Sequence, residues 1–212
     1  MNPGTVGRTV AGPAGELECA IDSPPGAAAT GVAVICHPHP LHGGTMDNKV
    51  VQTLARAAVQ RGWQAVRFNF RGVGRSSGAW DAGQGEVDDA LAVIAACRAP
   101  GQRLVLAGFS FGAFVAAQAD ARLGALAEGA GLTEARPERL VLIGPAVHNF
   151  PLPAVPAGTL VIHGETDDVV PLARVLDWAR PQAMPVVVVP GVGHFFHGQL
   201  PLLKQLAMPA FG

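Results

Sequence analysis

Six short runs of largely apolar residues recur along the chain, and several are apolar at nearly every position rather than at alternate ones. They are Val32–Cys36, Ala65–Phe70, Arg103–Phe109, Arg139–Ile143, Thr159–His163 and Pro185–Val189. A strand with apolar side chains on both faces must be covered on both faces, which is typical of parallel sheets. The runs therefore predict a central, mostly parallel sheet.

Segments with a helical period separate these strands. They are Met46–Arg61, Glu86–Arg98, Gly112–Leu123, Leu172–Ala179 and Gln199–Ala207. Alternation of strands and helices is the pattern of a doubly wound α/β fold, so we expect about seven or eight strands with helices on both faces. Within the first thirty residues, Arg8–Val10 and Glu16–Ile21 flank a Gly-Pro-Ala-Gly turn, which predicts an antiparallel hairpin at one edge of the sheet.

No linker or repeat divides the 212 residues, so we expect one α/β domain over residues 1–212. The least regular segment is Gly124–Pro137, which is either a helix extension or a loop. Gly144–Gly158 carries four prolines and predicts a loop above the sheet. Both segments are short, so we expect a minimal lid or none.

Composition excludes several functional classes. The formal net charge is −1, which gives no basic surplus for nucleic acid or an anionic membrane. Apolar residues make up 49% and charged residues 15%, which suits a large buried core. The three cysteines are too few and too scattered for a disulfide framework. We find no signal-peptide pattern and no apolar run of the roughly 18 to 20 residues that a membrane span needs, so we expect a cytoplasmic protein.

A Gly-x-Ser-x-Gly pattern, centred on Ser110, lies between a predicted strand and a predicted helix. The turn from strand to helix is so sharp there that the residues two positions away must be tiny, and Gly108 and Gly112 meet this need. The alternative is a serine in an ordinary Gly-rich turn. The flanking strand and helix favour Ser110 as a nucleophile.

A serine nucleophile needs a base and a carboxylate that orients the base. Asp167 and Asp168 follow one predicted strand, and His194 follows the next on a Gly-flanked loop. The order Ser, Asp, His suits an α/β sheet, where such residues gather at the carboxyl ends of the strands. We expect Asp167 to be the carboxylate, with Asp168 as competitor and one of the two capping the helix that begins near Pro171.

Two further stretches carry a family resemblance, and they are Cys36–Val51, with its His-Pro-His-Pro motif, and Phe68–Gly78. With the elements above, the chain resembles the α/β-hydrolase superfamily, in particular a small, lidless bacterial branch related to dienelactone-hydrolase-like and esterase-like proteins. The resemblance implies the fold and the Ser110, Asp167 and His194 triad. Dienelactone hydrolases proper carry Cys at the nucleophile position, so Ser110 points away from that reaction.

Two main-chain N–H groups are expected to form an oxyanion hole. One is that of Phe111, the residue after the nucleophile. The second comes from the loop after Val32–Cys36, where Pro38 and Pro40 have no N–H and leave His39 and Leu41. The resembling families use the residue two positions past the histidine that ends the strand, which implies His39.

Three other interpretations compete with this one. His37, His39 and His42 together suggest a metal-dependent hydrolase, although no acid and histidine pair completes the set at familiar spacing. A non-catalytic binding protein on a hydrolase fold is the second. The third is a phosphate loop at residues 71–76, which lacks the Lys-Ser/Thr ending. There we expect a tight loop in which Arg71 forms a structural ion pair.

The sequence thus predicts a serine hydrolase that cleaves a carboxylic ester or related acyl bond of a small molecule through an acyl-enzyme, without a cofactor. Leu41, Phe150 and Phe195 are candidate walls of the substrate pocket, and Phe111 and Phe196 could add to it. Ester, thioester and peptide-like substrates all remain open, as does the oligomeric state.

Overall fold

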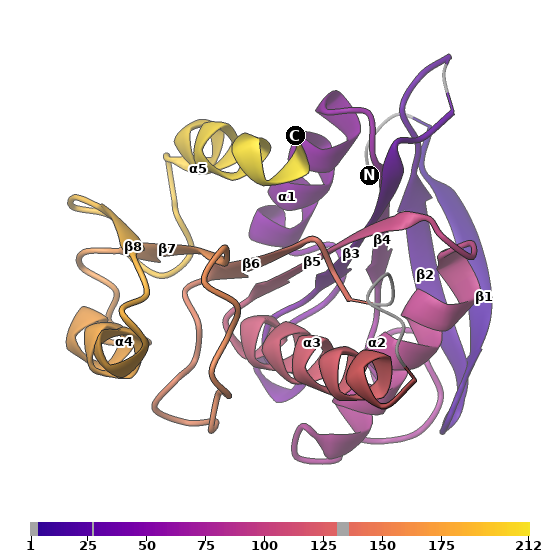
Figure 1. Ribbon diagram of the computed structural model, residues 1–212, viewed down its shortest axis with the longest axis horizontal. Helices are drawn as coiled ribbons and strands as arrows, with labels where there is room; N and C mark the ends of the chain where they lie inside the picture. The colour runs from indigo at the N-terminus through magenta and orange to yellow at the C-terminus, as the bar shows by residue number, and fades with distance from the viewer. Residues whose placement is uncertain (1–3, 27, 131–135) are drawn as a thin grey trace.

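The computed structural model describes residues 4–26, 28–130 and 136–212, and its centre is one eight-stranded sheet in the order β1-β2-β4-β3-β5-β6-β7-β8 (Figure 1). The two β1–β2 and β2–β4 pairings are antiparallel, and the other five are parallel. The strands are β1 (Val6–Gly12), β2 (Gly15–Asp22), β3 (Gly31–Cys36), β4 (Gln64–Phe68), β5 (Arg103–Phe109), β6 (Arg139–Ile143), β7 (Leu160–Gly164) and β8 (Val186–Val189).

Helices cover both faces of the sheet, as expected (Figure 1). On one face, α1 (Lys49–Gln60) and α5 (Leu200–Ala207) form an apolar core with the strands. On the other, α2 (Gln84–Cys97), α3 (Phe111–Ala130) and α4 (Leu172–Ala179) form a second core. The central strands are thus buried on both faces, which explains why their sequences are apolar at nearly every position.

The predicted bounds of β5, β6 and α4 are those observed, and most other ends shift by one to three residues for local reasons. Helix α1 begins at Lys49 because the Asn48 side chain caps it by accepting from the Val50 N–H at 2.9 Å. Strand β4 ends at Phe68 because the Phe70 N–H bonds to the His37 ring instead of a neighbouring strand, at 3.1 Å.

Helix α3 is longer than its predicted end at Leu123. It continues through Gly124 to Ala130, so the described part of the irregular 124–137 segment is mainly a helix extension, and residues 131–135 lie outside the described residues. Residues 145–158 contain no helix or strand, as expected for the Pro-rich loop. Within the described part of the chain, no helix combines the length and apolar character needed to span a bilayer.

Candidate active site

Ser110 occupies a sharp turn between β5 and α3. Its φ is 56°, in the left-handed region that residues other than glycine rarely adopt. A Cβ on Gly108 would lie 2.0 Å from the Gly112 carbonyl oxygen, and one on Gly112 would lie 2.3 Å from the Cys36 carbonyl oxygen. The two glycines of the motif are therefore required by close packing of the main chain, as the sequence predicted.

The strained turn is fixed to the neighbouring strand. The Ser110 N–H donates to the Ile143 carbonyl at the end of β6, at 2.9 Å. The next residue, Gly144, lies against the His194 ring, because a Cβ added to it would be 3.3 Å from Cε1. The Phe109 ring packs on the same imidazole with ring centroids 4.8 Å apart. These shared neighbours bring Ser110 and His194 to the same end of the sheet.

Asp167 and His194 form a buried, hydrogen-bonded pair. The His194 Nδ1–H donates to Asp167 Oδ2 at 2.7 Å, and both side chains are almost fully buried. This bond leaves Nε2 as the nitrogen able to accept a proton. Burial by itself raises the pKa of Asp167, but hydrogen bonds from His194 and the Val170 N–H outweigh it and hold the pKa below 3.8. The carboxylate is therefore kept charged beside the imidazole.

The structure separates the two adjacent acids. Asp167 Oδ1 accepts from the Val169 and Val170 N–H groups, at 3.0 and 2.7 Å, so this one residue both shapes the loop and contacts the histidine. Asp168 is exposed. The expectation that one acid caps the following helix was wrong, because Pro171 occupies the N-cap of α4 without a side-chain cap.

A second histidine, His163, lies close to the same oxygen of Asp167, and the sequence reasoning missed it. Its Nε2 donates to the Val170 carbonyl at 2.9 Å and lies 3.5 Å from Asp167 Oδ2. Burial lowers the pKa of His163 despite the nearby carboxylate, so the ring is neutral. Its buried Nδ1 has no hydrogen-bond partner among the residues that the structure describes. The position at the end of β7 was the available signal, since the predicted triad residues also follow strand ends.

Close packing between two loops holds the Asp167–His194 pair in place. A Cβ on Gly164 would lie 2.2 Å from the Val192 carbonyl oxygen, and the Thr166 N–H donates to that oxygen at 3.0 Å. The Glu165 side chain accepts from the Gly191 N–H at 2.8 Å. No local pattern in the sequence indicates these contacts, because they join residues far apart in the chain.

The loop after β3 is built around two histidine side chains. His37 Nδ1 donates to the Pro38 carbonyl at 2.6 Å, and its Nε2 accepts from the Phe70 N–H at 3.1 Å. Burial lowers its pKa to about 4, so it is neutral. His39 Nδ1 accepts from the Leu41 N–H at 3.2 Å, which leaves the Leu41 N–H already occupied.

These bonds weaken the metal interpretation of the three histidines. Both ring nitrogens of His37 are engaged by the main chain, so it has no lone pair for a metal ion. His39 and His42 stack on one another with centroids 4.5 Å apart. Over the described residues, no group of three or more His, Cys, Asp or Glu side chains is arranged to hold a metal ion.

Aromatic rings crowd the space between this loop and the start of α3. The His39 ring contacts Trp80, at 4.5 Å between centroids, and it also contacts Phe111 and Phe150. Phe111 and Phe150 pack edge to face at 4.9 Å. Trp80 was not among the sequence candidates, because it lies in the irregular segment between β4 and α2, where no motif marks it.

The three predicted pocket residues lie in different places around Ser110. Leu41 is exposed and lines a cavity of about 340 Å³ together with Trp80 and residues 71–73 and 78–79. Phe150 belongs to the aromatic cluster described above. Phe195 is exposed, and its ring centroid lies 5.1 Å from that of His194. Phe196 is not a wall, because it is fully buried in the core beneath α1 and α5.

Arg71 forms the structural ion pair that the sequence suggested. Its guanidinium and its main-chain N–H both donate to Asp89 of α2, with distances of 2.7 to 3.0 Å. Asp81 lies 3.6 Å away as a second acidic neighbour. The arginine therefore ties the loop after β4 to helix α2, and its charge is largely neutralised within the protein.

Comparison with solved structures identifies the class of fold. A serine hydrolase without a lid from Xanthomonas campestris is 38% identical, with a TM-score of 0.86 over 99% of this chain and 94% of that one. An α/β serine hydrolase homologue from Coxiella burnetii is 37% identical, with a TM-score of 0.78 over 98% and 97%. These matches place the chain among the lidless α/β-hydrolases and confirm the resemblance at the level of the superfamily.

Two sequence comparisons narrow the class further. Residues 33–155 match the family model described as serine aminopeptidase, S33, and the chain belongs to this family of hydrolases. An uncharacterised protein of Rickettsia prowazekii is 32% identical over 183 residues, covering 78% of this chain and 71% of the relative. Membership of this family identifies the chain as a hydrolase.

Proposed function

We propose that the protein cleaves carboxylic esters of small molecules through an acyl-enzyme on Ser110. The observation that carries the proposal is the buried His194–Asp167 hydrogen bond at 2.7 Å, beside a serine held at φ 56° in the turn before α3. A serine hydroxyl is a weak nucleophile on its own, and this arrangement supplies both a base and the group that orients it.

In the proposed mechanism, His194 Nε2 accepts the Ser110 proton as Oγ attacks the carbonyl carbon of the ester. Asp167 stabilises the imidazolium that forms, and the imidazolium then returns the proton to the leaving alcohol. Water attacks the acyl-enzyme in a second cycle with the same histidine as base. His163 Nε2 lies 3.5 Å from Asp167 Oδ2, and His163 is a positioning residue.

The oxyanion hole in this mechanism consists of the Phe111 and His39 N–H groups. Phe111 is the first residue of α3, so its N–H has no partner within the helix. The Leu41 N–H is occupied by His39 Nδ1, which favours His39 over Leu41 as the second donor. Loss of one such donor typically costs about 3 to 4 kcal/mol of transition-state stabilisation.

The surroundings of Ser110 favour small, flexible or flat acyl groups. The ordered walls are the half-buried rings of His39, Trp80 and Phe150, which pack on the fully buried Phe111 ring, and residues 145–158 form a loop without regular structure. Apolar and aromatic walls stabilise a bound ester mainly by removing its apolar surface from water. A charged acyl group finds little to pair with, because Arg71 is already bound to Asp89.

Labelling with a fluorophosphonate probe, combined with a panel of p-nitrophenyl esters of increasing chain length, tests the proposal. We expect the wild-type protein to be labelled and to hydrolyse short esters, and we expect Ser110→Ala to lose both properties while keeping its melting temperature. The change should lower kcat by roughly 10⁴- to 10⁶-fold. Ser23→Ala, at an exposed serine, serves as the matched control and should leave both unchanged.

Two results would contradict the proposal. Folded wild-type protein that resists the probe would favour a binding protein on a hydrolase fold. Labelling that persists in Ser110→Ala would show a different nucleophile. Amino-acid p-nitroanilides belong in the same panel, because the family model is described as serine aminopeptidase. Faster cleavage of anilides than of esters would replace the ester by a peptide-like substrate.

A further inference from the structure

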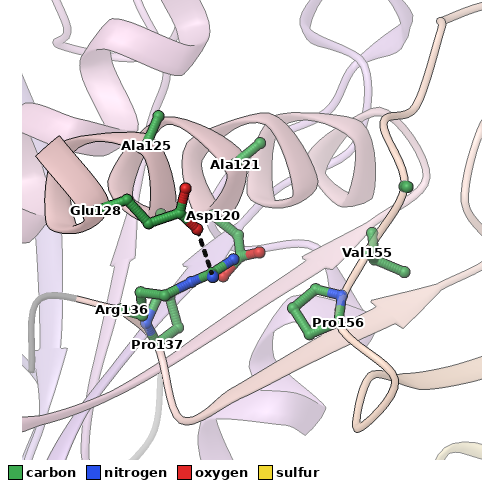
Figure 2. A pocket seen from close by; sticks show the side chains of 10 residues that line it. Asp120, Ala121, Ala125, Glu128, Arg136, Pro137, Val155 and Pro156 are labelled. Atoms are coloured by element: carbon green, nitrogen blue, oxygen red, sulfur yellow. Dashed lines mark hydrogen bonds and ion pairs between the residues drawn. The ribbon is translucent and has the colours of Figure 1, made fainter. Parts of the chain in front are cut away.

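A second cavity lies beside the C-terminal half of α3, away from Ser110. Its volume is about 640 Å³, and Figure 2 shows side chains from α3, from residues 136–137 and from the 154–156 loop around it. The walls are largely apolar, and three charged side chains face the space. The charged side chains are Asp120, Glu128 and Arg136, and the apolar lining includes Ala121, Ala125 and Val155.

Asp120 is the unusual member of this lining. The residue is 3% exposed, and its carboxyl faces the cavity without a hydrogen bond or ion pair to any described residue (Figure 2). Burial raises its pKa, and the positive charge of Arg136 opposes that rise only partly. A buried carboxyl normally has a partner, because its desolvation is otherwise uncompensated.

Arg136 is the nearby cation, and it is bound to another acid. Its guanidinium lies over Gly124, where a Cβ would be 2.8 Å from Nη2, and it forms an ion pair with Glu128 at 3.4 Å (Figure 2). The three charged groups of the cavity therefore sum to −1 when both acids are ionised. A monovalent cation would balance that charge and give Asp120 the hydrogen-bond donor that it lacks.

We infer that this cavity binds a small primary alkylammonium ion, with the ammonium group on Asp120 and the alkyl group against Ala121, Ala125 and Val155. An ammonium group offers three N–H donors to the carboxylate and needs no acceptor from the protein other than the acids present. The apolar walls suit an alkyl body. An anion is disfavoured, because Arg136 is already paired and the net charge would repel it.

This site is separate from the proposed catalytic residues. Asp120 lies nine residues beyond Phe111 on α3, which corresponds to about 14 Å along the helix axis at a rise of 1.5 Å per residue. The inference does not depend on ester hydrolysis, so loss of binding and loss of catalysis can be measured independently.

Titration with n-butylammonium chloride, followed by NMR of protein with labelled alanine methyl groups, tests the inference. Sodium chloride keeps the ionic strength constant, and n-butanol is the uncharged control ligand. We expect saturable shifts at the Ala121 and Ala125 methyls with butylammonium and none of comparable size with butanol. Asp120→Asn should weaken binding by about tenfold or more, since a hydrogen bond between charged groups is lost.

Asp88→Asn is the matched control, because Asp88 is a half-exposed acid on α2 that pairs with Arg122 outside the cavity. It should leave the affinity for butylammonium within twofold of wild type. Arg136→Gln should tighten binding severalfold, since it removes the competing positive charge. Thermal melts of all three variants establish that each is folded.

Several results would overturn the inference. Absence of saturable shifts in the wild-type protein would do so, as would equal affinity in Asp120→Asn or equal binding of butanol. Binding of sodium acetate at the same methyls, abolished by Arg136→Gln, would show that the cavity is an anion site instead.

Discussion

At the scale of single residues, the proposed chemistry depends on which of two adjacent acids meets His194. Asp167 is buried and bonded to the His194 imidazole, whereas Asp168 points to solvent. The two residues are adjacent in the chain, but a carboxylate at position 168 is exposed to solvent, whereas one at position 167 is bonded to the ring. The matched pair Asp167→Asn and Asp168→Asn separates these roles.

Asp167→Asn should lower kcat by about 10⁴-fold, because the neutral amide permits the wrong tautomer of His194 and no longer stabilises the imidazolium. Asp168→Asn should stay within twofold of wild type. Steady-state hydrolysis of a short p-nitrophenyl ester measures both. A damaging Asp168→Asn with a mild Asp167→Asn would reverse the assignment.

His39 offers a second prediction at this scale, because its side chain is the acceptor for the Leu41 N–H. His39→Ala should lower kcat roughly tenfold, since the loop that carries the main-chain donor loses its hydrogen bond and the donor moves. His39→Asn should restore most of kcat, because an Asn oxygen can accept the same bond. If the Ala and Asn variants have equal kcat, the ring nitrogen does not position the loop.

At the scale of elements, helix α3 shows two glycines with opposite structural roles. Gly112 lies where the main chain of β3 leaves no room for a Cβ, with the Cys36 carbonyl oxygen at 2.3 Å. Gly124 lies in the middle of the same helix, where the atom closest to an added Cβ is the end of the flexible Arg136 side chain. At Gly112 a Cβ would force main-chain atoms apart, whereas at Gly124 the flexible Arg136 side chain can move aside.

Gly124→Ala should therefore raise the free energy of unfolding by about 0.5 to 1 kcal/mol, the gain in helix propensity less the cost of moving Arg136. Gly112→Ala should lower it by about 3 kcal/mol or more and reduce ester hydrolysis, because two main-chain segments must separate. Urea unfolding monitored by circular dichroism compares the two. Equal changes in the free energy of unfolding would show that helix propensity, and not contact with the neighbouring main chain, determines the effect of both substitutions.

At the scale of the whole molecule, buried acids give the stability of the fold a dependence on pH. Burial raises the pKa of Asp120, whereas the pKa of Asp167 lies below 3.8. An acid with a raised pKa in the folded state favours folding when it is protonated. Its contribution is complete below pH 3.8 and is lost as the pH rises through the higher pKa of the folded state. Asp167 acts in the opposite direction, since its contribution is present above pH 3.8 and is lost as the pH falls.

Asp120→Asn should accordingly raise the melting temperature at pH 7.5, where the wild-type carboxylate is charged and desolvated beside Glu128 and Arg136. The difference from wild type should shrink as the pH falls toward 3.8, because the folded protein takes up the Asp120 proton at a higher pH than the unfolded chain does. Differential scanning calorimetry at both values measures it, with Asp88→Asn as the control. A variant that is less stable than wild type at pH 7.5 would show that the Asp120 charge is compensated in the folded protein.

The sequence by itself determined the order of strands and helices along the chain, the sharp turn that carries the proposed nucleophile, and the residues at the ends of three strands. These are local properties, because apolar runs, helical periods and the two glycines around Ser110 can be read from neighbours along the chain. Tertiary structure decided what depends on distant segments meeting. It made Asp167 rather than Asp168 the partner of His194, and it placed His163 beside the same carboxylate. It also continued α3 past Gly124 beneath Arg136 and left Asp120 buried beside a cavity. These outcomes rest on packing and hydrogen bonds between residues far apart in sequence, which no local pattern encodes.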